Sequence, residues 1–77
     1  MSNRYALGKI FHEQLIPQFV AARKKKGISQ LEMDEILGVA KGLVSKWEVG
    51  IRRPSGYLCC CWADSLDMKI TLTAKGE

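Results

Sequence analysis

Two short runs in the middle of the chain repeat their apolar residues at helical spacing. The first run lies before Gly38 and the second before Gly50. Their apolar residues are Met33, Ile36 and Leu37 in the first run, and Leu43, Val44 and Trp47 in the second. Intervals of three or four residues place side chains on one face of a helix. The pattern therefore predicts two short helices joined by a tight turn.

Capping residues mark both ends of the first of these helices. Ser29 and Glu32 have the spacing of a capping box, in which the hydroxyl and the carboxylate each accept a backbone N–H bond from the other's residue. Gly38 can take the left-handed conformation that ends a helix. Two helices of about two turns each cannot bury their apolar faces alone. We therefore expect the flanking segments to form a supporting scaffold.

The N-terminal part of the chain predicts two further helices. Residues 9–15 have the pattern of a short helix. Its inward-facing residues are expected to be Ile10, Phe11 and Leu15. Pro17 suits the first position of a second helix, where its missing N–H costs nothing. The basic run at residues 23–26 suits the negative C-terminal end of that helix, and Gly27 ends it.

The C-terminal part predicts one more helix and an extended tail. Ser55 is a suitable N-cap for the helix. The residues at three-and-four spacing within it are Leu58, Cys61, Trp62 and then Ser65 or Leu66. Cys61 is thus expected to face inward, and Trp62 to fill the core rather than stack on bases. Residues 69–73 alternate polar and apolar side chains, which is the period of a half-buried strand.

Length and charge narrow the possibilities. The 77 residues are enough for one domain, which we expect to span residues 1–77, with an N-terminal segment at 1–15 and a strand-like tail at 69–77. A hydrophobic content of 47% is typical of a folded globule. Twelve basic residues against eight acidic ones give a net charge of +4. This balance is compatible with a polyanionic partner such as nucleic acid.

The composition offers no sign of a metal site or a membrane anchor. The three cysteines, Cys59–Cys61, are adjacent and lack the spacing of zinc ligands. We interpret them as small apolar residues in a reducing compartment and expect no metal and no cofactor. The longest uncharged apolar run, residues 57–63, is too short to span a bilayer. The first residues also lack an apolar signal core, so we expect a cytoplasmic protein.

The order of short motifs in the centre of the chain resembles one family of DNA-binding domains. These motifs are Ser-Gln at 29–30, Leu-Gly-Val at 37–39, Val-Ser-Lys-Trp-Glu at 44–48, and then Gly, Arg and Pro up to residue 54. Together they resemble the phage-repressor (Cro-like, XRE) family. The resemblance covers residues 16–72 and is strongest over 28–54. It implies an all-α fold, a compact lambda-repressor-like domain of four to five helices with a helix-turn-helix at about 29–50, to which the tail would add a short β-strand.

The resemblance also assigns roles to individual residues. Its recognition helix would run from about residue 41 to 48 and enter the major groove. The implied base-contacting residues are Lys41, Gly42, Ser45 and Lys46. The implied phosphate-contacting residues are Ser29, Gln30, Arg52 and Arg53. Arg23 and Glu48 match an ion pair that ties the first family helix to the end of the recognition helix.

Several residues depart from the family pattern. Asp34 stands where alanine is usual, and a buried carboxylate is costly unless it is bonded. It could accept N–H bonds from the start of the recognition helix, since Ala40 stands where the family favours a serine or threonine cap. Leu31 and Ile36 are apolar where solvent-facing residues are usual, so a place against the N-terminal segment or a partner is expected.

These features favour a sequence-specific regulator that binds a double-stranded DNA operator as a homodimer, with repression as its expected output. Pairing of the tails of two copies would satisfy their unpaired backbone groups. One alternative is the antitoxin of a toxin–antitoxin pair, which binds its operator and a toxin protein. Another is a protein-interaction domain that has lost DNA binding. The basic residues argue against this second alternative. An enzyme is not expected, because His12 is the single histidine and no nucleophile motif or phosphate-binding loop is present.

Overall fold

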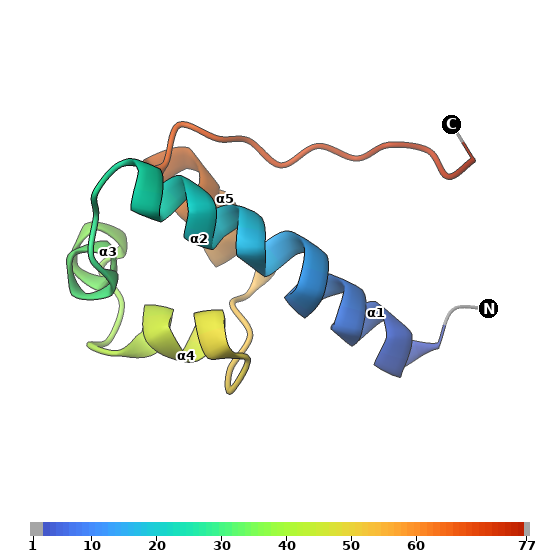
Figure 1. Ribbon diagram of the computed structural model, residues 1–77, viewed down its shortest axis with the longest axis horizontal. Coiled ribbons are helices and arrows are strands. Elements are labelled where there is room, and N and C mark those ends of the chain that lie inside the picture. Colours follow the sequence, from blue (N-terminus) through green and yellow to red (C-terminus); the bar gives the residue numbers. More distant parts are fainter. Residues whose placement is uncertain (1–2, 77) are drawn as a thin grey trace.

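The computed structural model describes residues 3–76, and within this range the chain is all-helical. The N-terminal half forms a long rod of three segments: α1 (Arg4–Ile10), the π-helical η1 (Phe11–Leu15) and α2 (Ile16–Lys25). Three shorter helices follow, and they are α3 (Gln30–Leu37), α4 (Leu43–Val49) and α5 (Gly56–Ser65). Figure 1 shows α3, α4 and α5 gathered around α2, while α1 extends away from this body.

The rod corrects the expectation of two separate helices before residue 27. Asn3 caps its start, with Oδ1 accepting the Tyr5 N–H at 2.8 Å, and the helix then passes through Pro17 without a break. A proline ring inside a helix clashes with the carbonyl four residues earlier, here that of Glu13. The backbone avoids this clash by widening, because the Ile16 N–H bonds to the Phe11 carbonyl five residues back. The proline therefore lies in the first turn of α2, as its residue type predicts, but this turn follows a π turn of a continuous rod rather than a break in the chain.

The core is formed by residues from four helices. Its buried apolar residues are Ile16, Phe19, Met33, Val44, Trp47, Cys59, Trp62, Ala63 and Leu66. Trp62 is fully buried and stacks on Phe19, with ring centroids 4.1 Å apart and planes at 14°. Trp47 of α4 packs against Trp62 at 5.3 Å. The expectation that Trp62 fills the core is confirmed, and the aromatic contacts bind α4 to α2 and α5.

Two expectations about inward-facing residues are wrong. In α5 the buried face begins at Cys59 and includes Trp62 and Ala63, so Cys61 is only half-buried. The expected face with Cys61 and the observed face with Cys59 both contain Trp62, so the spacing of apolar residues does not distinguish between them. Burial raises the pKa of the Cys59 thiol, with a smaller contribution from Cys60. In the rod, Ile10 is 48% exposed because α1 extends beyond the body formed by α2, α3, α4 and α5.

The tail after α5 is extended but forms no strand within residues 3–76. The Met68 N–H anchors it to the Ala63 carbonyl at 2.8 Å, and Met68 and Ile70 line a hollow against Phe19 of α2. Leu72 beyond them is almost fully exposed. Figure 1 shows the tail running back along the rod on the side opposite α4. A strand needs a hydrogen-bonded neighbour, and a single copy of this chain supplies none there.

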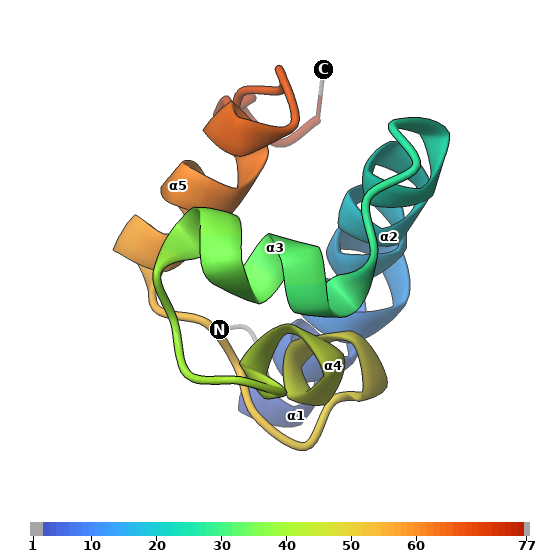
Figure 2. The same ribbon diagram turned by 90° about the vertical axis from the view of Figure 1, so that its left-hand side faces the viewer.

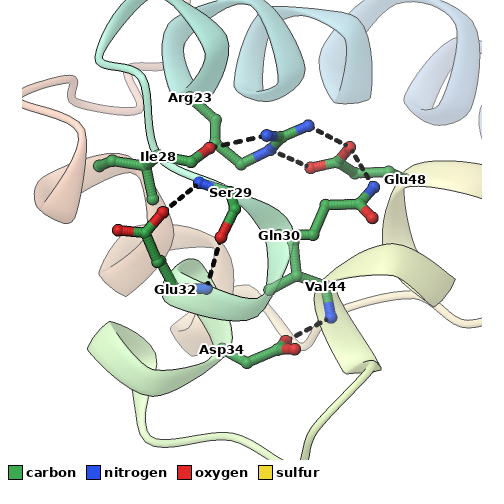
Figure 3. Close-up of polar contacts among 8 residues, drawn as sticks. All are labelled: Arg23, Ile28, Ser29, Gln30, Glu32, Asp34, Val44 and Glu48. Carbon is green, nitrogen blue, oxygen red and sulfur yellow. Dashed lines mark hydrogen bonds and ion pairs between the residues drawn. The ribbon is translucent and has the colours of Figure 1, made fainter.

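A buried ion pair holds three helices in place (Figure 3). Arg23 of α2 donates from Nε to Glu48 Oε2 at 2.7 Å and from Nη2 to Glu48 Oε1 at 3.0 Å. Its third contact, from Nη1 to the Ile28 carbonyl at 2.8 Å, fixes the connection between α2 and α3. Gln30 of α3 donates to Glu48 Oε1 at 2.9 Å. The two charged side chains are 8% and 6% exposed, so the pair is largely removed from water.

Replacing Arg23 by alanine should sharply lower the thermal stability. The substitution leaves the buried Glu48 carboxylate without its cation, which costs about 3–5 kcal/mol, and in so small a domain this lowers the Tm by about 10 °C or more. Circular dichroism melts of Arg23→Ala and of the exposed control Lys25→Ala measure the difference. Equal melting curves for the two variants would contradict the structural role of the pair.

Candidate nucleic-acid interface

One side of α4 is buried and the other is free. Val44 and Trp47 point into the core, whereas Lys46 and Val49 are exposed and Ser45 is half-exposed. Figure 2 shows α3 crossing above α4, on the side from which Val44 and Trp47 enter the core. A helix is about 10–12 Å across and fits the major groove of DNA. The free side of α4 can therefore be inserted into a groove without any change in the core.

The turn before α4 corrects the expected start of the recognition helix. The helix begins at Leu43, so Lys41 and Gly42 belong to the turn rather than to the first helical positions. Gly42 has φ +89°, a left-handed conformation that other residues rarely adopt. Gly42 lies before the helix, so it does not carry the cost in stability of a glycine inside a helix. A Cβ at this position would meet open space, so only the backbone conformation requires glycine.

Asp34 replaces the missing cap of α4 (Figure 3). Its carboxylate accepts the Gly42 N–H at Oδ2 and the Val44 N–H at Oδ1, both at 2.8 Å, although the residue is only 2% exposed. No side chain at the cap position of α4 provides such a bond. The positive N-terminal end of a helix favours a carboxylate placed this way. Asp34 thus joins α3 directly to the start of α4.

The start of α3 brings Ser29 and Gln30 next to α4. Ser29 Oγ accepts the Glu32 N–H, Glu32 Oε1 accepts the Ser29 N–H, and both distances are 3.0 Å. These hydrogen bonds lower the pKa of Glu32, the bond from the Ser29 backbone contributing most. Gln30 uses one amide hydrogen on Glu48, which leaves its second amide hydrogen and the Ser29 hydroxyl hydrogen as further donors.

Arg52 and Arg53 lie in the loop that follows α4, and both are exposed. The loop is tightened by the Lys46 carbonyl, which accepts the N–H groups of Gly50, Ile51 and Arg52 at 3.0, 3.0 and 3.3 Å. With Lys41 before the helix and Lys46 on its free side, the four cations are spread along the whole length of α4. Sequence reasoning did not find the contact of Arg53 with Gly8 of α1, where a Cβ would lie 2.6 Å from Arg53 Nη2.

The two unusual apolar residues of α3 remain exposed. Leu31 is 51% and Ile36 is 55% exposed. Figure 1 shows α1 and α3 at opposite ends of the molecule, so the expected place for these residues against the N-terminal segment is wrong. No group of three or more potential metal-binding side chains occurs within residues 3–76.

Replacing Asp34 by alanine should loosen the turn between α3 and α4. Two backbone N–H groups lose their acceptor, and leaving such buried donors unbonded costs about 1–3 kcal/mol. Amide hydrogen exchange should accelerate at Gly42 and Val44, while the exposed control Glu35→Ala should leave both rates unchanged. If the Val44 amide stayed equally protected in Asp34→Ala, the carboxylate would not be what holds this turn.

Comparison with known proteins places the chain in a family. Residues 20–67, more than half of the chain, match the family model HTH_3, described as helix-turn-helix. Neither the curated proteins nor the solved structures gave a match. None of the helices described for residues 3–76 combines the length and apolar character needed to cross a membrane. The chain belongs to the helix-turn-helix family HTH_3 and is a DNA-binding transcription regulator of the XRE type.

Proposed function

We propose that this protein is a sequence-specific repressor that binds its operator as a homodimer, with α4 of each copy in the major groove. The observation that carries the proposal is the free, basic side of α4, opposite a side that is fully used by the core. Occupancy alone suffices for repression, because a bound dimer excludes polymerase from the DNA that it covers. The protein would then act at the nucleoid in the cytoplasm.

The proposed base contacts come from the turn before α4 and from its free side. Lys41 and Lys46 would donate to the O6 and N7 acceptors of guanine, and Ser45 to a base edge or a phosphate. Gly42 would allow the backbone to approach the groove closely, since no side chain stands in the way there. Its own N–H is already bonded to Asp34, so the glycine would read no base itself.

The proposed phosphate contacts surround this helix. Arg52 and Arg53 would meet the backbone beyond the C-terminal end of α4. Ser29 and Gln30 would meet it near the start of α3, through the donors that their contacts within the protein leave free. Phosphate contacts set the position and most of the affinity, whereas the base contacts set the sequence preference.

The tail supports the homodimer part of the proposal. Residues 68–73 are extended, exposed and without a paired neighbour in one copy. Pairing with the same segment of a second copy would form a two-fold ribbon and bury Leu72. Sedimentation velocity at micromolar concentration should show a dimer on operator DNA. A monomer at every concentration, with and without DNA, would contradict this.

DNA binding can be tested with the promoter of the protein's own gene, with random duplex as competitor. Log affinity should fall linearly with log salt, by about 0.9 for each neutralised phosphate. Lys46→Ala should change the preference among sequences, because it removes a base contact. Arg53→Ala should weaken binding to all duplexes alike and lower the salt slope by about 0.9. Gel shifts over a salt series measure both quantities.

Two results would contradict this function. One is affinity for duplex DNA no greater than that of an inert protein of the same charge. The other is an unchanged order of sequence preference in Lys46→Ala. Binding to DNA in either assay would also exclude the protein-interaction domain that has lost its DNA site.

A second candidate, an antitoxin, is favoured by the two exposed apolar residues of α3. Leu31 and Ile36 lie outside the core and could cover a toxin surface while α4 binds the operator. A small toxin gene next to this one, whose growth arrest is relieved by co-expression of this protein, would support that candidate. Relief should then be lost in Leu31→Asp/Ile36→Asp and kept in Lys46→Ala.

A further inference from the structure

The helix α1 lies on the same side of the molecule as α4. Figure 1 shows the rod descending from the top of α2 to the level of α4, and Figure 2 shows α1 behind α4 at that level. The tail and α5 lie toward the opposite side in both views. The rod thereby carries α1 beyond the helix-turn-helix on the side of α4 (Figure 1).

Arg53 connects α1 to the loop after α4. A Cβ built on Gly8 would lie 2.6 Å from Arg53 Nη2 and 3.3 Å from Arg53 Cζ. The guanidinium therefore occupies the space that any other residue at position 8 would need. Gly8 is an unusual choice in a helix, since glycine is a poor helix former. Here its missing side chain allows the arginine to lie directly on the helix backbone.

A second guanidinium flanks the same place. A shallow hollow of about 300 Å³ is lined by Arg4, Leu7, Gly8, Phe11 and Arg53. Arg4 precedes Gly8 by one helical turn, so its side chain is on the same face of α1. No acidic side chain lines this hollow within the described chain, and both arginines are exposed. The hollow thus presents two cations beside an apolar floor.

We propose that Arg4 and Arg53 form a second phosphate clamp, which binds the sugar–phosphate backbone of the same duplex beyond the groove occupied by α4. The inference rests on the proposed DNA-binding function. Arginine donates two parallel hydrogen bonds to one phosphate, so each of the two guanidinium groups offers donors for a phosphate. Gly8 is the positioning residue that lets Arg53 reach this site. The clamp adds affinity without adding sequence preference, since it contacts no base.

Duplex DNA is the occupant that the geometry favours. Arg53 of the loop at the end of α4 lines the hollow, and its other lining residues belong to the rod, whose α1 end lies on the same side of the molecule as α4 (Figure 1). Its apolar floor and two cations suit a phosphodiester together with its sugar. An acidic peptide, in contrast, would bind there whether or not α4 holds DNA. Binding should therefore depend on the length of DNA that extends past the operator half-site on the α1 side.

The first test compares Arg4→Ala with Lys75→Ala, which removes the same charge from the tail on the opposite side. Arg4→Ala should weaken operator and random duplexes equally, by about threefold to tenfold, and lower the salt slope by about 0.9. Lys75→Ala should leave the affinity and the slope unchanged. Trimming the duplex on the α1 side should remove the difference between Arg4→Ala and the unsubstituted protein.

The second test uses Gly8→Ala, which places a methyl group where the guanidinium lies. Alanine is the better helix former, so the Tm should not fall, while DNA affinity should. The matched control is Gly56→Ala, because a Cβ there meets nothing within 4 Å. In an Arg53→Ala background, Gly8→Ala should have no further effect, since the double-mutant cycle isolates their coupling.

The outcomes separate this proposal from the function on which it rests. If the unsubstituted protein binds no duplex, the proposed function itself is wrong. If it binds but Arg4→Ala behaves like Lys75→Ala, the clamp does not exist. If Gly8→Ala lowers affinity equally with and without Arg53, the glycine does not act through this arginine. Equal losses on long and trimmed duplexes would contradict a contact of the clamp with DNA beyond the half-site.

Discussion

The Arg23–Glu48 ion pair is the contact on which the presentation of α4 depends. It joins the rod to the last turn of α4, and Gln30 adds a bond from α3 to the same carboxylate. Asp34 joins α3 to the first turn of α4 by accepting the N–H groups of Gly42 and Val44. Helix α4 is thus held at both ends by a buried carboxylate, and Trp47 packs into the core between them. A helix of only seven residues needs such anchoring, because it is too short to be stable alone.

This arrangement also determines the charge that α4 shows to its surroundings. Two carboxylates at its ends are bonded inside the protein: Glu48 pairs with the Arg23 guanidinium, and Asp34 accepts backbone N–H bonds. Lys41, Lys46 and the loop arginines are not involved in these contacts and remain exposed. Buried negative charge fixes the helix, and exposed positive charge surrounds its free side. A partner that carries phosphates would contact the exposed positive charges without disturbing the buried carboxylates.

Much of this architecture could be predicted from local signals. The capping box at Ser29 and Glu32 and the left-handed Gly38 form as predicted, because each depends on residues within one helical turn. The role of Asp34 as an acceptor for the N–H groups at the start of α4 could also be predicted, because Ala40 has no side chain that could cap this helix. The resemblance to the XRE family suggested the partners Arg23 and Glu48, which the structure brings together.

Other features depend on contacts that no local pattern contains. Pro17 interrupts a helix in most settings, and only the π turn at Phe11 allows the rod to continue. The two possible registers of α5 share Trp62, and tertiary packing chose the one with Cys59 inside. The contact of the Arg53 guanidinium with Gly8 joins residues that are far apart in the sequence.

Mapping the DNA contacts residue by residue tests the central claim most directly. Amide chemical shifts of the labelled protein can be followed during titration with operator duplex. We expect the changes to concentrate at residues 29–30, 41–46 and 50–53, with a second group in α1. Residues of α5 and of the tail opposite α4 should stay largely unaffected apart from contacts between copies. Changes confined to α5, with residues 41–46 silent, would contradict the claim that the free side of α4 binds DNA.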